Sequence, residues 1–312
     1  GKFSVSGAVT KADCITKVYD SLSDEDKSDS EAEYEELLPL FLNLLKSLSD
    51  KDNKKQALYD LAKLRAQLAI THAFDGFDIE TSEALDLLKS SDDDLLTELD
   101  KEKRARLVAA VNNLIEFAVC EEYQLTSEIY STIPDFDFDT EIFNPDDEEN
   151  EDDRELLIAL CRKYNLTYAT VENDDIEYAM AIALAWIKYS KDSLLMYMTQ
   201  NDDRVRPWHY ALQGYTATKD DFPSWMIPPI EWGCRCFLVD TEGDSIINKG
   251  NFKDIKDMTA PKKPSQLNNV FSESVAKCGR IFGKSHHYFQ VGEDDKEVLK
   301  EFVEQIKAEY YG

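Results

Sequence analysis

The sequence predicts a mainly α-helical N-terminal domain, followed by an α+β C-terminal domain with long loops and a few short strands. Apolar residues recur at helical spacing between residues 31 and 131. Prolines, glycines and short apolar runs accumulate after residue 201. Residues 134–151 are rich in acidic side chains, with two prolines and no glycine. These observations predict an acidic helical domain at 1–133, an acidic linker at 134–151 and a second domain at 152–312.

The helices of the first domain are predicted from their apolar stripes. The clearest stripe, in residues 101–122, places Leu107, Val111, Leu114 and Ile115 on one face. Further helices are predicted at 31–48, 56–74, 82–88 and 94–99, and Gly76 is expected to end the second of these. The acidic, serine-rich run 23–30 is predicted to be a solvated loop.

The second domain mixes helical patterns with short apolar runs. Helices are predicted at 152–164, 174–190 and 296–310. Strands are predicted at 194–198 and 236–239, where short apolar runs are flanked by turn residues.

The negative charge is concentrated in the first two thirds of the chain. The formal net charge is −28, from 63 acidic and 35 basic side chains. Residues 201–312 carry 18 acidic and 15 basic side chains, so residues 1–200 hold the other 45 acids and 20 bases. Because an acidic surface repels phosphate, we do not expect residues 1–200 to coat DNA. They suit docking to a basic partner instead.

The six cysteines, at positions 14, 120, 161, 234, 236 and 278, do not form the dense pattern of a disulfide framework. They fit a reducing cytoplasm. No apolar run reaches the length of a membrane span, so no membrane partner is expected.

Residues 202–238 combine several separated motifs, reading DDRVRPWHYALQGYTATKDDFPSWMIPPIEWGCRCFL. An Asp-x-Arg is followed by a histidine, a leucine, a glycine and an acidic pair, and then by a double proline and Cys-Arg-Cys. The motif residues are Asp202, Arg204, His209, Leu212, Gly214, Asp220, Asp221, Pro228, Pro229, Cys234, Arg235 and Cys236. In this order they resemble the core motif of the Mu F-like phage head-morphogenesis family.

The resemblance implies a structural minor head protein of a tailed phage or prophage, without a catalytic residue. Its expected place of action is head assembly at or near the portal. The implied partners are portal and capsid or scaffold proteins. The implied location is the host cytoplasm during assembly and then the virion. The family's domain would correspond to residues 152–312.

His209 and the Cys234–Cys236 pair have the residue types of a zinc site. Thiolates and imidazole are preferred zinc ligands, and a loop-rich region gains folding energy from such an ion. A fourth ligand would have to come from Cys278, His286, His287 or a carboxylate. In the alternative interpretation, His209 forms hydrogen bonds within a turn while the two cysteines pack as small apolar side chains. A disulfide is a third interpretation.

The arginines and the basic stretch 261–290 each have two interpretations. Arg204 and Arg235 can pair with Asp202, Asp203, Asp220 or Asp221, because guanidinium groups bind carboxylates well. They can also contact the phosphates of packaged DNA. The stretch 261–290 has five basic residues, one acid and interleaved aromatics, which suits DNA contact or an ordinary surface.

Two other function classes compete with the structural one. A metal-assisted nuclease or toxin-like effector could use His209 as a base, oriented by Asp202 or Asp220. A DNA-mimic protein would rely on the acidic charge alone.

Overall fold

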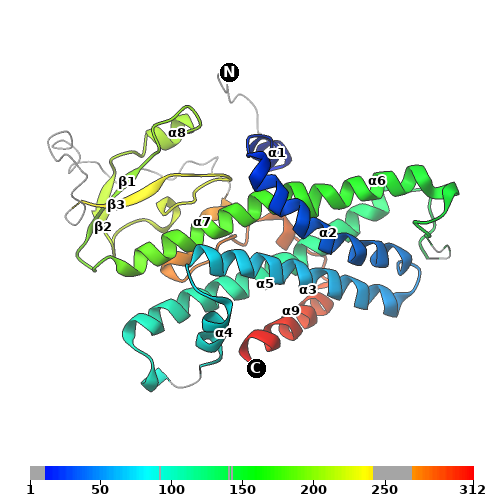
Figure 1. Ribbon diagram of the computed structural model, residues 1–312, viewed down its shortest axis with the longest axis horizontal. Coiled ribbons are helices and arrows are strands. Elements are labelled where there is room, and N and C mark those ends of the chain that lie inside the picture. The colour runs from blue at the N-terminus through cyan, green and yellow to red at the C-terminus, as the bar shows by residue number, and fades with distance from the viewer. Residues whose placement is uncertain (1–10, 91–92, 140, 142, 242–268) are drawn as a thin grey trace. The chain divides into compact units, whose positions relative to one another are not determined.

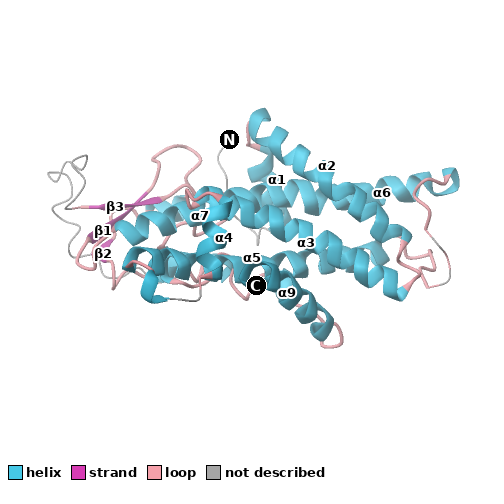
Figure 2. Ribbon diagram, turned by 60° about the horizontal axis from the view of Figure 1, so that its bottom comes forward, coloured by secondary structure: helices cyan, strands magenta, loops and turns pink. Residues whose placement is uncertain are grey.

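The computed structural model describes residues 11–90, 93–139, 141, 143–241 and 269–312. About 65% of the chain is helical, and the described residues contain a small three-stranded antiparallel sheet. This confirms the prediction of a mainly helical protein with a small α+β part. Figures 1 and 2 show helices through most of the chain and strands in a single place.

The chain divides into two compact units, each built from segments that are distant in sequence. The first unit comprises Gly1–Ala69, Ile115–Asp174 and Gln290–Lys307. The second comprises Ile70–Leu114, Asp175–Phe289 and Ala308–Gly312. These units follow a different division from the predicted domains 1–133 and 152–312. The predicted linker, 134–151, falls within the first unit.

The helices and strands largely follow the apolar patterns of the sequence. The helices are α1 (Lys11–Asp20), α2 (Asp24–Lys46), α3 (Lys51–Gly76), α4 (Thr81–Lys89), α5 (Glu98–Thr132), α6 (Glu151–Arg162), α7 (Ala169–Lys188), α8 (Pro207–Tyr210) and α9 (Lys296–Tyr311). The strands are β1 (Leu194–Met198), β2 (Thr216–Thr218) and β3 (Phe237–Asp240).

Several predicted boundaries were wrong. The run 23–30 is not a loop, because α2 begins at Asp24. Negative side chains at the start of a helix interact favourably with the helix dipole, so an acidic run can begin a helix. Helix α5 continues to Thr132 rather than ending at 122, since Leu125 and Ile129 extend its buried stripe. Strand β2 was not predicted, because its side chains are only half-buried.

The first unit buries a charged cluster around Arg65. The guanidinium donates to Glu121 Oε2 at 3.0 Å and to Glu172 Oε2 at 3.2 Å. It also donates to Asn173 Oδ1 at 3.0 Å. The side chain is fully buried, and so are its carboxylate partners, which come from helices α5 and α7. This cluster therefore joins three helices by hydrogen bonds that water cannot replace.

The cluster contains more carboxyl groups than cations, since Arg65 already faces Glu121 and Glu172, and the fully buried Glu122 adds a third carboxyl group. Burial raises the pKa of Glu122 to about 7, while Arg65 opposes that rise. Burial likewise raises the pKa of Glu121 well above its ordinary value. One guanidinium cannot neutralise three buried carboxylates, so proton uptake balances the charge.

A π-helical segment, Lys163–Tyr168, continues α6 and positions polar groups in the first unit. Its Asn165 amide donates to Glu122 Oε2 at 3.4 Å. Tyr164 and Lys163 both donate to the Glu128 carboxylate, at 2.6 and 2.7 Å. The wider turn thereby joins this segment to α5.

The acidic stretch 134–151 packs against the first unit through its aromatic residues. Phe138 and Phe143 are buried, and Phe136 contacts both rings. Most of its acidic side chains stay exposed. Alternation of aromatic and acidic residues thus gives this loop a buried side and a solvated side.

The second unit contains the sheet, in which β1 lies between β2 and β3. The pairing is antiparallel, with Met196 opposite Thr216 and Tyr197 opposite Leu238. Helix α3 ends at Gly76, as predicted, where a Cβ atom would lie 2.2 Å from the Glu177 carbonyl oxygen of α7. Only glycine permits this close contact between two backbones.

None of the described helices is both long and apolar enough to span a membrane.

We expect Arg65→Met to lower the free energy of unfolding by about 3–5 kcal/mol, because it leaves buried carboxylates without their cation. The matched control is Arg162→Met, whose ion pair with Glu31 has side chains 46% and 43% exposed. That control should cost less than about 1 kcal/mol. Urea unfolding measures both, and equal losses would contradict the proposed importance of the buried cluster.

The stability of the protein should fall between about pH 4.5 and 7, because the pKa of Glu122 is raised on folding. The neutral carboxyl stabilises the fold below the ordinary glutamate pKa, and this stabilisation is lost as the pH rises through the folded value. Arg65, Glu121, Glu172 and Asn165 face this group. We expect Glu122→Gln to weaken the pH dependence and to stabilise the protein at pH 8 by about 3 kcal/mol.

Unfolding measured from pH 5 to 8.5 tests this expectation. Glu293→Gln is the control, because that side chain is 86% exposed. An unchanged slope for Glu122→Gln would mean that Glu122 is already ionised in the folded protein at pH 5.

Candidate metal centre

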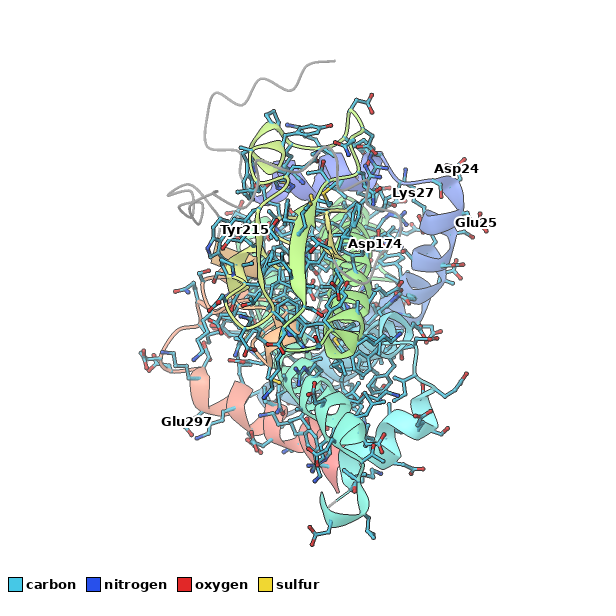
Figure 3. All side chains as sticks on the ribbon, turned by 90° about the vertical axis from the view of Figure 1, so that its left-hand side faces the viewer. Asp24, Glu25, Lys27, Asp174, Tyr215 and Glu297 are labelled. Carbon is cyan, nitrogen blue, oxygen red and sulfur yellow. The ribbon has the colours of Figure 1, made fainter. Side chains whose placement is uncertain are left out.

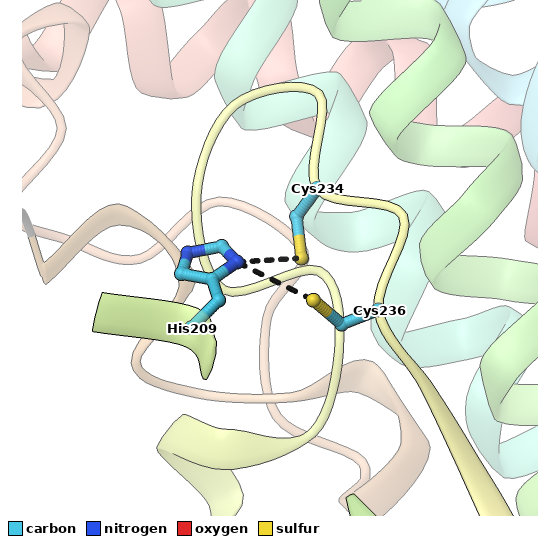
Figure 4. Close-up of side chains that lie close together, drawn as sticks. All are labelled: His209, Cys234 and Cys236. Carbon is cyan, nitrogen blue, oxygen red and sulfur yellow. Dashed lines mark hydrogen bonds between the residues drawn. The ribbon is translucent and has the colours of Figure 1, made fainter. Parts of the chain in front are cut away.

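Three side chains from two separate segments form a buried thiol–imidazole group. His209 Nδ1 lies 3.3 Å from the Cys236 sulfur and 3.9 Å from the Cys234 sulfur. All three ligand atoms lie within 4.8 Å of one another. Figure 4 shows His209 projecting from α8 towards the two cysteines, which precede β3. The structure therefore brings together the histidine and the cysteine pair that the sequence singled out.

The local sequence explains how each member is placed. Pro207 occupies the first turn of the short helix α8, where its fixed φ angle favours helix initiation. His209 then points inward and is only 2% exposed. In the Cys-Arg-Cys segment, Cys234 and Cys236 are buried while Arg235 between them is half-buried. This is the alternation of an extended strand.

The second ring nitrogen of His209 faces a carboxylate that the sequence analysis missed. Nε2 lies 3.3 Å from Glu231 Oε2. Arg206 pairs with the same oxygen at 2.9 Å, and the Trp208 indole donates to it at 3.1 Å. The one feature of the sequence that could have predicted this contact is that Glu231 lies three residues before Cys234.

The pKa values of His209, Cys234 and Cys236 are shifted by different causes. Burial opposes the charged form of His209, but hydrogen bonds with Cys234 and Glu231 outweigh it and raise the pKa. Burial raises the pKa of the Cys234 thiol well above its ordinary range. The hydrogen bond with Cys234 lowers the pKa of Cys236, and Arg206 and Arg235 act in the same direction. Cys236 is thus the more easily ionised thiol of the pair.

The Asp-x-Arg turn is tied to the Cys-Arg-Cys segment. Asp202 Oδ1 accepts from the Arg204 backbone N–H at 3.1 Å, and Asp202 Oδ2 accepts from the Arg235 guanidinium at 2.6 Å. Arg235 thus has the aspartate partner that one of the two interpretations assigned to it.

Helix α7 and the residue directly after it, Tyr189, hold the cysteine segment through three polar side chains. The Gly233 N–H donates to both oxygens of the buried Asp175 carboxylate, at 3.1 and 3.0 Å. The Tyr178 and Tyr189 hydroxyls donate to the carbonyls of Cys236 and Leu238, at 2.6 and 3.2 Å. Sequence reasoning missed these contacts, because they depend on how α7 packs.

The other motif residues shape the backbone. Leu212 is buried, and Gly214 has a φ of 88°, which favours glycine. The Gly214 N–H donates to the Tyr197 carbonyl of β1 at 2.8 Å. Asp221 accepts from Thr218 at 2.8 Å and closes the turn after β2.

The remaining positions of the motif are an acidic residue, Asp220, and the two prolines. The exposed Asp220 contributes its backbone carbonyl, which accepts from Lys277 at 3.1 Å. Pro228 and Pro229 are buried, and the peptide bond between them is cis.

Cys278, predicted as a further ligand, is exposed and does not belong to the group. His286, another predicted source of a ligand, is buried among Trp232, Phe282 and Tyr288. These aromatic contacts place it in a core. The fourth ligand sought among these side chains is therefore not found in the described part of the chain.

The basic stretch 261–290 is described only from residue 269 onward. Lys277 donates to the Phe222 carbonyl at 2.6 Å and lies over the Trp186 ring. Arg280 donates to the Phe282 carbonyl at 3.1 Å. Contact of this stretch with DNA stays a prediction, although these two side chains already have partners within the protein.

No protein-family model matches the chain, and no curated protein or solved structure matches it either.

We expect Gly233→Ala to destabilise the second unit by about 1–2 kcal/mol. Its φ of 63° is left-handed, a conformation that a Cβ atom disfavours. Gly292→Ala is the control, because a Cβ there meets nothing closer than 3.9 Å. It should change stability by less than about 1 kcal/mol. Thermal unfolding compares the two variants, and equal shifts would refute the role assigned to the Gly233 backbone.

Proposed function

We propose that this chain is a non-catalytic structural protein that acts in the assembly of a tailed-phage head, at or near the portal. The resemblance of residues 202–238 to the Mu F-like family motivates the proposal. One observation carries it: the chemically distinctive side chains of that segment make contacts within the protein. His209, Cys234 and Cys236 contact one another, and Asp202 pairs with Arg235. Such a segment serves architecture.

The same geometry disfavours a nuclease that uses His209 as its base. A general base has to reach the substrate proton directly or through one water. His209 is 2% exposed, and its two ring nitrogens face Cys236 and Glu231. Neither Asp202 nor Asp220 orients the ring, since Asp202 pairs with Arg235 and Glu231 takes the orienting position. Cleavage of DNA or RNA that is lost in His209→Ala would contradict this part of the proposal.

The acidic helices suit docking to a basic surface on a portal or scaffold protein. Residues 1–200 carry most of the acidic excess. Asp24 and Glu25 at the start of α2 are exposed, as is Glu297 of α9, and Figure 3 labels all three. Attraction between such a surface and a basic partner acts mainly on encounter and orientation, and salt screens it.

We expect binding to the cognate portal protein to weaken about tenfold between about 0.01 and 0.15 M ionic strength. The double substitution Asp24→Asn with Glu25→Gln should reduce this salt dependence. Glu297→Gln is the matched control, because it removes an exposed acid outside residues 1–200. Binding that is insensitive to salt would exclude electrostatic docking.

Particle composition tests the role in assembly itself. The chain should be found in purified heads by mass spectrometry, in a copy number far below that of the major capsid protein. If heads form with normal yield and infectivity when this chain is absent, the proposal is overturned.

A further inference from the structure

We propose that His209, Cys234 and Cys236 together bind one zinc ion, and that Tyr197 supports the site by donating a hydrogen bond to the Cys236 sulfur. This inference goes beyond the proposed role in head assembly and does not depend on it. The ion would join α8 to the segment before β3.

The spacing of the three ligand atoms fits a tetrahedral ion. Zinc binds imidazole nitrogen at about 2.0–2.1 Å and thiolate sulfur at about 2.3 Å, so the ligand atoms of a tetrahedral site lie about 3.5–3.8 Å apart. The nitrogen-to-sulfur distances here are 3.3 Å for Cys236 and 3.9 Å for Cys234. The two sulfurs lie within 4.8 Å of each other, so side-chain movements of about 1 Å or less would bring the three atoms to the spacing of a tetrahedral site.

The surroundings of His209 prepare its Nδ1 atom for a metal. Glu231 lies beside Nε2, so that nitrogen carries the proton and Nδ1 keeps its lone pair. Arg206 and Trp208 hold the same Glu231 oxygen in place. Metal-binding histidines commonly have such a carboxylate on the opposite ring nitrogen, where it fixes the orientation of the ring.

Tyr197 is an independent observation that points to the same site. The residue is fully buried, and its hydroxyl has no hydrogen-bond partner among the oxygen and nitrogen atoms of the described residues. It lies beside the Cys236 sulfur. A thiolate bound to zinc would accept a hydrogen bond from this hydroxyl and satisfy the buried group.

The three protein ligands leave one coordination position. Among the described residues, no fourth histidine, cysteine or carboxylate shares their spacing. We assign this position to a water molecule enclosed with the ion, because Cys234 and Cys236 are only 3% and 2% exposed.

The loop-rich region around the site would gain stability from the ion. Residues 199–241 contain only short helices and two short strands, and most of their other backbone hydrogen bonds close local turns. A metal bound by two of their segments contributes its binding energy to folding.

The test uses the reduced full chain, purified without added metal and then titrated with Zn²⁺ and Co²⁺. Each chain should bind one Zn²⁺ ion. With Co²⁺ in its place, the protein should show the absorption spectrum of a tetrahedral site with two thiolate ligands. Cys234→Ser and His209→Ala should abolish the cobalt spectrum. Cys278→Ser is the matched control and should leave the spectrum unchanged, because Cys278 is exposed and outside the group.

Tyr197→Phe should weaken zinc binding by about 10–100-fold while one ion per chain still binds. An unchanged affinity would overturn the role of Tyr197 as a positioning residue.

If the ligand variants do not fold, thiol alkylation followed by mass spectrometry tests zinc binding in the wild-type protein instead. In the wild-type protein, zinc should slow the alkylation of Cys234 and Cys236 beyond what their burial alone does, while Cys278 reacts, and a chelator should reverse this added protection. A folded, reduced protein that binds no zinc would overturn the proposal, as would a disulfide between Cys234 and Cys236.

Discussion

The histidine at position 209 presents one ring nitrogen to two sulfurs and the other to a carboxylate, and the loops of the second unit depend on this arrangement. Glu231 sets the orientation of the ring from one side, and Cys234 and Cys236 close around it from the other. Because the group is buried, water cannot substitute for any of these contacts. Segments that contain only short helices and strands are thereby joined to one another.

Helix α7 extends this arrangement into the rest of the second unit. Asp175 and Tyr178 bind the backbone of Gly233 and Cys236, on either side of Cys234. The Asp202–Arg235 pair joins the same segment to the turn before α8. The cysteine segment is thus held by a helix, a turn and an imidazole. These three contacts together restrict the cysteine segment to one conformation.

The first unit also has a buried polar group, the charged cluster around Arg65. Arg65 is fully buried, and the hydrogen bonds to Glu121, Glu172 and Asn173 compensate for its desolvation. Glu122 adds a carboxyl group whose pKa is raised by burial, so proton uptake contributes to the charge balance. Both units therefore bury polar groups that need specific partners, and such groups restrict a core to one arrangement.

The helical character, most helix positions, two of the three strands in the described part of the chain and the three members of the thiol–imidazole group were predictable from the sequence. Apolar periodicity and residue chemistry are local, so a sequence records them directly. The partners that surround that group follow instead from the way the chain packs. Glu231 has no periodic signal, Asp175 and Tyr178 act through the packing of α7, and Tyr197 occupies an ordinary strand position. The exclusion of Cys278 and the burial of Arg65 also depend on the packing of segments distant in sequence, which no local pattern encodes.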